Sequence, residues 1–419
     1  MHKYSGQAAR NFGRQFSDAM KNRTLTIWLM LGHFANDWPI TALWLIVPAV
    51  GLSMGLSPVE VGLLFTIGNV GAALAYLPAG ILADHVSNRG RLLLATFWWV
   101  SLGYLLASTA SGFWSLALLL ALAGMGDAAW HPIATAVLTR ENKERRAYVL
   151  GMHAVGGSMA EVLAPLVAGV LLAFVDWRTV LALSTVPTVI MGICFIWVAR
   201  TIPQVKKMRV KRHDFIHLLN IWRKGNGLRM VAMICFYNMS LMALFSMIPL
   251  YLAAQHGLET WIIGLVISGI LIFGALAQPG IGKASDIIGR RNIVVGGNLI
   301  AGLACIVLVF QPLLWIIILA MFVAITPLVA IRAAILAGAV DHSDRSEGAT
   351  LGLAFVLMDG IGAFGSLLAG AAASISWVHM FGLAAAFSMI AAALGIFTVF
   401  GRAAGSTSEA QSPRKANLG

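Results

Sequence analysis

Long apolar runs alternate with short polar stretches along almost the whole chain. A helix needs about 20 mainly apolar residues to cross about 30 Å of hydrocarbon, because its backbone polar groups must be bonded within the segment. Twelve segments meet this requirement, so we expect an all-α integral membrane protein with 12 transmembrane helices. The predicted spans are 25–50, 60–83, 91–110, 113–138, 147–174, 177–199, 228–253, 260–282, 292–311, 313–339, 348–373 and 377–400.

The first six predicted spans are repeated in the last six. The stretch GILADHVSNRGR at 80–91 resembles GKASDIIGRR at 282–291. Parallel repeats of this kind occur in transporters, whose substrate sites lie near the bilayer midplane between the repeats. We therefore expect two pseudo-symmetric six-helix bundles. The residues that match at the same separation along the chain are Asp84 with Asp286, Asn36 with Asn238, and Gly62 with Gly264.

The repeat divides the chain into five parts. An N-terminal bundle at 25–199 and a C-terminal bundle at 228–400 are joined by a linker at 200–227, with tails at 1–24 and 401–419. The three cysteines all fall within predicted spans and form neither a disulfide framework nor a metal-binding spacing. We therefore expect no cofactor and no metal.

The charges of the chain indicate its orientation. Only 11% of the residues are charged and 59% are hydrophobic, which is typical of a membrane protein. The net charge of +12 would suggest a nucleic-acid partner in a soluble protein, but nearly all of the 29 Lys and Arg lie on one side of the predicted spans. By the positive-inside rule both termini and the linker are then cytoplasmic. We expect a multi-pass plasma membrane protein, in a bacterial inner membrane because the loops are short, with no nucleic-acid partner.

The two repeated loops each carry a glycine, an acid and basic residues. This pattern resembles the loop after the second helix in the major facilitator superfamily, and the resemblance covers nearly the whole chain. It implies the fold of that superfamily and a conformational latch, in which the acid pairs with an arginine or a helix amino terminus in one access state. The alternative is a short turn that only obeys the positive-inside rule. The predicted latch residues are Gly80, Asp84, Arg89, Arg91, Asp286, Arg290 and Arg291.

Two further motifs narrow the resemblance. The fifth span carries small residues around a proline, similar to the fifth helix of proton antiporters in the superfamily, and Gly151, Pro165 and Gly169 are its predicted helix-packing residues. A tight helix interface without bearing on transport direction is the alternative. GHFAND at 32–37 and GMGDAAWHP at 124–132 resemble the fosmidomycin-resistance subgroup of efflux proteins.

Ionisable side chains within the spans are expensive to bury in a bilayer and therefore suggest function. The acids Asp37, Asp127, Glu161 and Asp359 fall at close to one predicted depth. His33 precedes Asp37 by four residues and His131 follows Asp127 by four, so each pair shares a helix face. An imidazole one turn from a carboxylate can share a proton with it, and we predict that these two pairs and Glu161 couple transport to protons. Satisfied polar contacts between packed helices are the alternative, and a metal site ranks below both.

Substrate-binding candidates come from both halves. They are Asn36, Trp44, Trp130, Asn238, Arg332 and Asp359. Three positions remain open for Arg332: it reaches the cytoplasmic rim, pairs with Asp359, or faces an anionic substrate.

The sequence therefore predicts a secondary transporter that works by alternating access, and not an enzyme. Our first interpretation is a proton-coupled efflux antiporter for a small amphipathic or anionic drug or metabolite. A proton symporter that imports a small organic anion uses the same acids and is the alternative. A non-transporting membrane sensor or scaffold is the third possibility. The expected partners are the substrate, protons and the lipid bilayer, with the protein functional as a monomer.

Overall fold

The chain folds into helices alone over the part that this computed structural model describes, residues 2–142, 145–204, 220–342 and 347–400. The side chains of residues 2–21, 84, 146–147 and 347–349 lie outside the description. The helices of the N-terminal half are α1 (His2–Met54), α2 (Pro58–His85), α3 (Arg89–Ser108), α4 (Phe113–Glu141), α5 (Arg146–Leu172), α6 (Trp177–Ser184) and α7 (Val186–Val198). Those of the C-terminal half are α9 (Asn226–His256), α10 (Thr260–Ile288), α11 (Arg290–Val309), α12 (Leu314–His342), α13 (Glu347–Phe355), the π-helix η1 (Val356–Ile361), α14 (Phe364–Ile375) and α15 (Trp377–Phe397).

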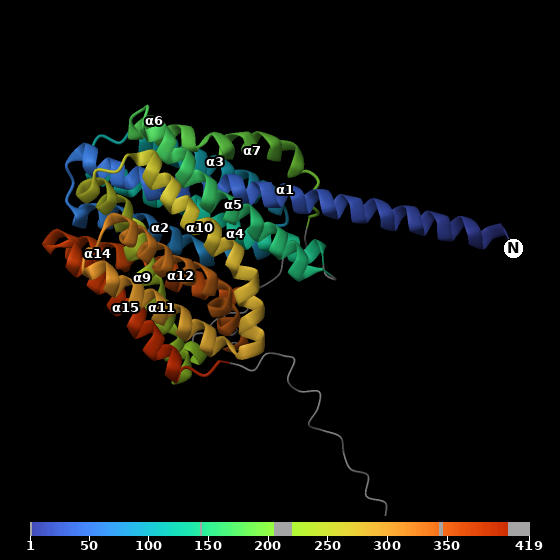
Figure 1. The fold of residues 1–419 in the computed structure, drawn as a ribbon. Coiled ribbons are helices and arrows are strands. Elements are labelled where there is room, and N and C mark those ends of the chain that lie inside the picture. The colour runs from blue at the N-terminus through green and yellow to red at the C-terminus, as the bar shows by residue number, and fades with distance from the viewer. Residues whose placement is uncertain (1, 143–144, 205–219, 343–346, 401–419) are drawn as a thin grey trace, which may run out of the picture.

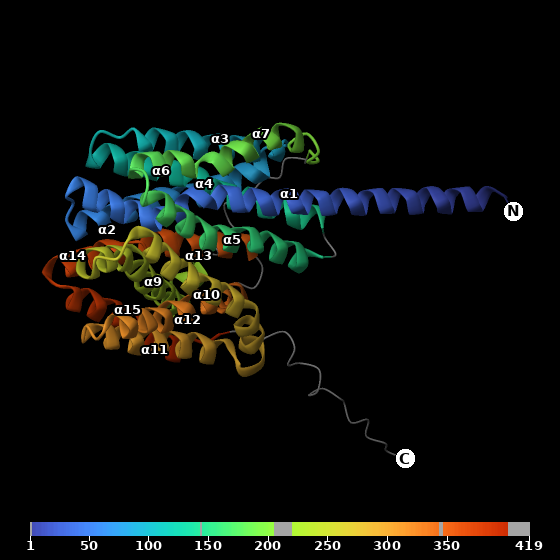
Figure 2. The same ribbon diagram turned by 45° about the horizontal axis from the view of Figure 1, so that its top comes forward.

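Twelve helical segments are long and apolar enough to cross a membrane, which confirms the predicted number. The two halves lie side by side, with α1 to α7 on one side and α9 to α15 on the other (Figures 1 and 2). We call the end of the molecule where residues 55–57 join α1 to α2 the first-loop end. The opposite end, where α3 begins after Asn88 and α7 ends before the linker, is the basic end.

Three spans differ from the predicted single helices. The first begins far earlier, because α1 starts at His2 and projects beyond the bundle at the basic end (Figure 1). The sixth is divided into α6 and α7 at Thr185, two residues before Pro187, which has no backbone N–H to continue a helix. The eleventh is divided into α13, η1 and α14, and its π-helical turn contains Asp359. Single π-helical turns occur frequently at functional sites.

Two helix pairs hold the halves together through the same repeated contact. Where α2 meets α14, a Cβ added to Gly62 would overlap the carbonyl oxygen of Ser366. Where α10 meets α5, a Cβ added to Gly264 would lie 2.9 Å from the carbonyl oxygen of Pro165. Gly62 and Gly264 match in the repeat, so each half supplies its second helix to the fifth helix of the other. Small residues permit this close approach of backbones.

Hydrogen bonds accompany both contacts at the first-loop end. Thr66 donates to the carbonyl of Ala363 at 3.0 Å, and Thr260 donates to the carbonyl of Gly169 at 3.0 Å. Pro165 and Gly169 thus lie at a tight interface, and that interface joins the two halves. Gly151 does not lie at a tight interface, because nothing lies within 4 Å of a Cβ added there and the residue is exposed. A packing role for Gly151 stays a prediction, and the contact of α5 with α10 lies at the other end of α5.

We predict that Gly62→Ala destabilises the protein and that Gly68→Ala, on the same helix, does not. The new methyl group at position 62 would force α2 away from α14, and overpacking of this kind costs about 1–3 kcal/mol. A Cβ at Gly68 meets nothing within 4 Å, and alanine favours a helix over glycine. Thermal unfolding of both purified variants measures the difference. Equal unfolding temperatures would show that α2 and α14 can move apart to accept the methyl group without loss of stability.

Candidate functional site

Two histidines and two aspartates from α1 and α4 form one cluster. His33 Nε2 lies 3.1 Å from Asp37 Oδ2 on α1. His131 Nε2, on α4, lies 3.8 Å from Asp37 Oδ1 and 3.8 Å from Asp127 Oδ2. The sequence predicted the pairs within each helix, and the structure adds the contact between helices through His131. We call these four residues the His–Asp cluster.

A backbone carbonyl of α5 determines which ring nitrogen of His33 carries a hydrogen. His33 Nδ1 lies 2.7 Å from the carbonyl oxygen of His153, which can only accept a hydrogen bond. Nδ1 must therefore carry a hydrogen. The other ring nitrogen, Nε2, faces the carboxylate of Asp37. A single proton between these two atoms satisfies both of them.

Asn36 holds Asp127 in place. Its side-chain NH₂ donates to Asp127 Oδ1 at 2.8 Å and to the backbone carbonyl of Asp127 at 3.3 Å. The residue is 0% exposed. In this structure the amide binds α1 to α4 and orients the carboxylate, and substrate contact at Asn36 stays a prediction.

Two α5 residues beside the cluster, His153 and Gly157, were not among the predicted site residues. The His153 ring stacks on the His33 ring with centroids 4.1 Å apart, and His153 Nδ1 lies 3.1 Å from the carbonyl oxygen of Leu29. A Cβ added to Gly157 would lie 2.7 Å from His33 Cε1 and 3.3 Å from Asp37 Oδ2. Because glycine has no Cβ, position 157 leaves room for the side chains of His33 and Asp37. The sequence signal that could have found it is the GG pair at 156–157, four residues before Glu161.

An ion pair joins the halves beside this cluster. Arg332 Nη1, on α12, lies 3.3 Å from Glu161 Oε1, on α5. The side chains stay 35% and 30% exposed, so both retain access to small molecules. Arg332 was predicted to reach the rim, pair with Asp359 or face a substrate. The structure pairs it with Glu161, because α5 approaches the C-terminal half more closely than the sequence could indicate.

A second link between the halves ends on Asp359. The hydroxyl of Tyr76, on α2, donates to Asp359 Oδ2 at 2.6 Å. The Tyr76 ring stacks on Phe355 at 5.6 Å and lies 6.3 Å from the ring of His131. Tyr76 therefore stands between the His–Asp cluster and the acid of the other half. Between described residues, no hydrogen bond or ion pair joins the halves closer to the basic end than those of Tyr76 and Arg332.

Three other predicted substrate residues lie in different surroundings. Trp130 is 0% exposed and packs against Phe97 at 4.7 Å in the core of the N-terminal half. Asn238 is also buried, and it donates to the carbonyl of Met358 in η1 at 2.6 Å. Substrate contact at these two residues stays a prediction. Trp44 is half-buried and contacts Phe245 of the other half at 4.8 Å.

The predicted latch residues form contacts within their own halves. Arg290 lies 3.5 Å from Asp286 and 2.7 Å from Asp341, all in the C-terminal half. Arg89 is buried and its Nε donates to the carbonyl of Ala83 at 2.6 Å. The side chain of Asp84 lies outside the described part of the chain. A Cβ added to Gly80 would lie 3.8 Å from Pro132 Cβ, and Arg91 and Arg291 are exposed. A latch between the halves at the basic end stays a prediction.

The His–Asp cluster also offers three atoms of the kinds that bind metals. Ligand atoms of His33, Asp37 and His131 lie within 4.8 Å of one another. Such a set could hold a transition metal, but His33 and Asp37 already satisfy each other through a hydrogen bond of ordinary length. The prediction that the protein has no metal and no cofactor stays a prediction.

Comparison with known proteins now identifies the family. The model of the Major Facilitator Superfamily matches residues 29–274 and 261–417. The chain belongs to this superfamily. The fold and the prediction of a transporter, not an enzyme, are thereby confirmed.

Individual relatives are more distant. A probable 4-methylmuconolactone transporter of Cupriavidus pinatubonensis is 29% identical over 171 residues, which cover 39% of this chain and 40% of that protein's length. A bacterial homologue of the human lysosomal transporter Spinster, in an inward-facing and occupied conformation, has a TM-score of 0.76 at 16% identity and covers 90% of this chain and 96% of its own. The nucleoside transporter NupG has a TM-score of 0.69 at 11% identity, over 89% of this chain and 98% of its own. The two structures share the fold.

We predict that Gly157→Ala reduces transport about tenfold or more, because the methyl group displaces His33 from Asp37 and small misplacements in a site have large effects on rate. Gly151→Ala, on the same helix, is the control, because its Cβ meets open space. Transport by both variants in proteoliposomes, at equal protein content and equal unfolding temperature, measures the effect. Full activity of Gly157→Ala would mean that the His33–Asp37 contact is not needed.

Proposed function

We propose that this superfamily member is a proton-coupled efflux antiporter for small amphipathic or anionic compounds. The observation that carries the proposal is the His–Asp cluster, in which Nε2 of His33 lies 3.1 Å from Asp37 and His131 lies within 3.8 Å of both aspartates. Charged groups in a membrane interior are rare and expensive, and chains of Asp, Glu and His form proton relays in pumps and transporters. The cluster brings four such groups together within two helices.

The cluster has a direct means of changing its charge. A proton added to the cluster neutralises one carboxylate, and a proton removed leaves His33 Nε2 as an acceptor facing Asp37. His131 contacts both carboxylates, so a proton gained at Asp37 alters the pairing of Asp127. In this mechanism protonation of Asp37 and Asp127, assisted by His33 and His131, alternates with substrate occupancy. Glu161 is a further proton carrier.

The contacts between the halves connect this charge to conformation. Protonated Glu161 no longer forms an ion pair with Arg332, so the link between α5 and α12 weakens. Arg332 is then available to a carboxylate or phosphate of the substrate, which competes with Glu161 for the guanidinium. This exchange would let a proton on Glu161 and an anionic substrate on Arg332 bind together, which is the arrangement of the symporter considered below. In the antiporter the protons that alternate with the substrate are those of Asp37 and Asp127.

The direction of transport rests on orientation and on resemblance. The positive-inside rule makes the basic end cytoplasmic. Both termini then lie on the cytoplasmic side of a bacterial plasma membrane. The described links between the halves reach from the first-loop end only to the depth of Tyr76 and Arg332, so this structure corresponds to an inward-facing state. Resemblance of GHFAND and GMGDAAWHP to the fosmidomycin-resistance subgroup supports efflux. The protein would act as a monomer.

A proton symporter that imports a small organic anion is the second candidate. It is favoured by the partly exposed Arg332 at the interface of the halves. A partial relative is named for 4-methylmuconolactone, which suggests small lactones and their acids as compounds to test. Symport and antiport use the same acids and differ in whether protons and substrate move in the same direction. A non-transporting sensor or scaffold would show neither movement.

Proton movement in proteoliposomes that contain a pH-sensitive dye tests the proposal. We expect that antibiotics, phosphonates or organic acids added outside release protons from an acidic lumen if the compound is a substrate. Protons that move in the same direction as the compound would establish symport and overturn efflux by antiport. No proton movement with any compound, in protein that binds one of them, would support the sensor.

The double variant Asp37→Asn/Asp127→Asn tests the assignment of the protons. We expect proton release to fall about a hundredfold, as for removal of groups that transfer protons, while binding of an uncharged substrate persists. Glu141→Gln, which removes a carboxylate at the end of α4 outside the cluster, should transport normally. Proton-coupled transport that survives in the double variant would exclude the His–Asp cluster as the coupling site.

A further inference from the structure

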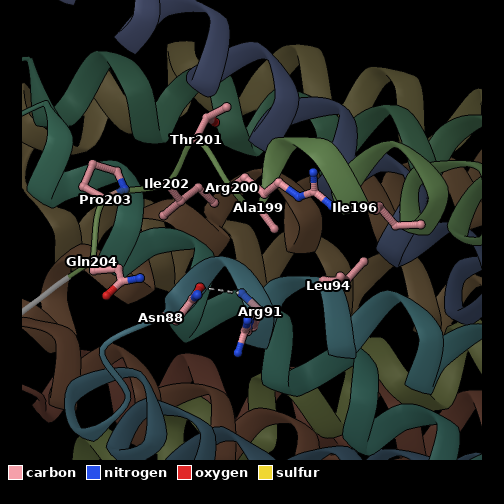
Figure 3. A pocket seen from close by; sticks show the side chains of 10 residues that line it. All are labelled: Asn88, Arg91, Leu94, Ile196, Ala199, Arg200, Thr201, Ile202, Pro203 and Gln204. Atoms are coloured by element: carbon pink, nitrogen blue, oxygen red, sulfur yellow. Dashed lines mark hydrogen bonds between the residues drawn. The ribbon is translucent and has the colours of Figure 1, made fainter.

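A pocket of about 650 Å³ opens at the basic end of the N-terminal half, far from the His–Asp cluster. The first turns of α3 form one wall with Asn88, Arg91 and Leu94, and residues 196–204 form the other (Figure 3). The pocket lies on the face of this half that is turned away from the C-terminal half, where α3 and α7 lie (Figures 1 and 2). Movements of one half against the other therefore leave its walls intact. The volume is that of a small-molecule site.

The polar part of the pocket is positively charged and unpaired. Arg91 and Arg200 both line it and are exposed. Among the described residues, no ion pair involves either guanidinium. Asn88 uses its side-chain oxygen to cap the backbone N–H of Arg91 at 3.0 Å, which fixes the start of α3 beside the guanidinium groups. Two unpaired arginines suit a phosphate group, since a guanidinium binds phosphate oxygens in pairs.

The rest of the pocket is apolar and continues toward the membrane. Leu94, Ile196 and Ile202 line it beside the arginines. The transmembrane segments that form its walls begin at Arg89 and end at Val198, so the pocket lies where the hydrocarbon meets the polar layer. Trp197 is 60% exposed at this level, as expected for an interfacial anchor. A ligand that fits this lining has an anionic head and an apolar remainder.

We propose that this pocket binds the phosphate headgroup of an anionic phospholipid in the leaflet at the basic end. Juxtamembrane arginines are attracted to anionic lipids on the cytoplasmic side. The residues that directly follow Gln204 in the sequence are an unsuitable occupant, because all of their charged side chains up to Arg212 are basic. These are Lys206, Lys207, Arg209, Lys211 and Arg212. The lipid would bind α3 to the end of α7 from outside and leave the transport site free.

Native mass spectrometry of the full chain with phosphatidylglycerol and phosphatidylcholine tests the proposal. We expect retention of the anionic lipid and little of the zwitterionic one. In Arg91→Gln/Arg200→Gln the preference should fall about thirtyfold, or about 2 kcal/mol at about 1.4 kcal/mol per tenfold change. Arg140→Gln/Arg229→Gln is the matched control, because it removes the same charge from exposed positions at the same end outside the pocket. The preference should persist there.

A filling variant separates the pocket from its charges. Thr201→Trp keeps both arginines and places an indole in the pocket, so we expect it to lose the lipid as well. If instead the arginine double variant retains phosphatidylglycerol as the wild type does, or if the control loses it equally, the pocket is not the site. The last compound to test is glycerophosphoglycerol, the headgroup without acyl chains. If this soluble compound binds as well as phosphatidylglycerol, the assignment to a lipid is overturned. Size-exclusion elution and unfolding temperature verify that each variant is folded.

Discussion

An ionised side chain inside a bilayer must find an opposite charge, a hydrogen bond or water, and the site of this protein follows from that requirement. Asp37 and Asp127 lie in the middle of predicted spans and cannot reach the surface, because their side chains are short. Each is instead contacted by an imidazole and by Asn36. His33 is in turn held by the backbone carbonyl of His153 on α5. A charged site in the membrane thus requires three helices, α1, α4 and α5, to be packed with little freedom.

The same requirement explains why the links between the halves are placed where they are. Glu161 and Asp359 each belong to one half and are satisfied by Arg332 and Tyr76 of the other. If the halves separate at this depth, both acids lose a partner and need a proton, a substrate cation or water in its place. The glycine contacts nearer the first-loop end contain backbone carbonyls and no charges. Protonation can therefore alter the links at the midplane while it leaves the glycine contacts unaffected.

Local spacing in the sequence predicted what lies on one helix and failed where helices meet. His33 and Asp37 are four residues apart, so their contact could be read from the helical period, and the same holds for Asp127 and His131. The approach of His131 to Asp37 depends on how α1 and α4 are rotated, which no spacing within one helix contains. The pairing of Glu161 with Arg332 depends likewise on the approach of the two halves. The repeat predicted two bundles, yet it did not indicate that Gly62 and Gly264 would form the contact between them.

Two of the predicted substrate residues are buried in this structure for a common physical reason. Trp130 and Asn36 were expected to face the substrate because polar or aromatic residues in a span suggest a site, but both are buried in contacts between α4 and its neighbours. Residue type alone does not distinguish a side chain that binds the substrate from one that holds another side chain in place. The orientation of hydrogen bonds makes that distinction. Asn36 donates to Asp127 and the carbonyl of His153 accepts from His33, so these hydrogen bonds orient the His–Asp cluster and leave Nε2 of both histidines facing Asp37.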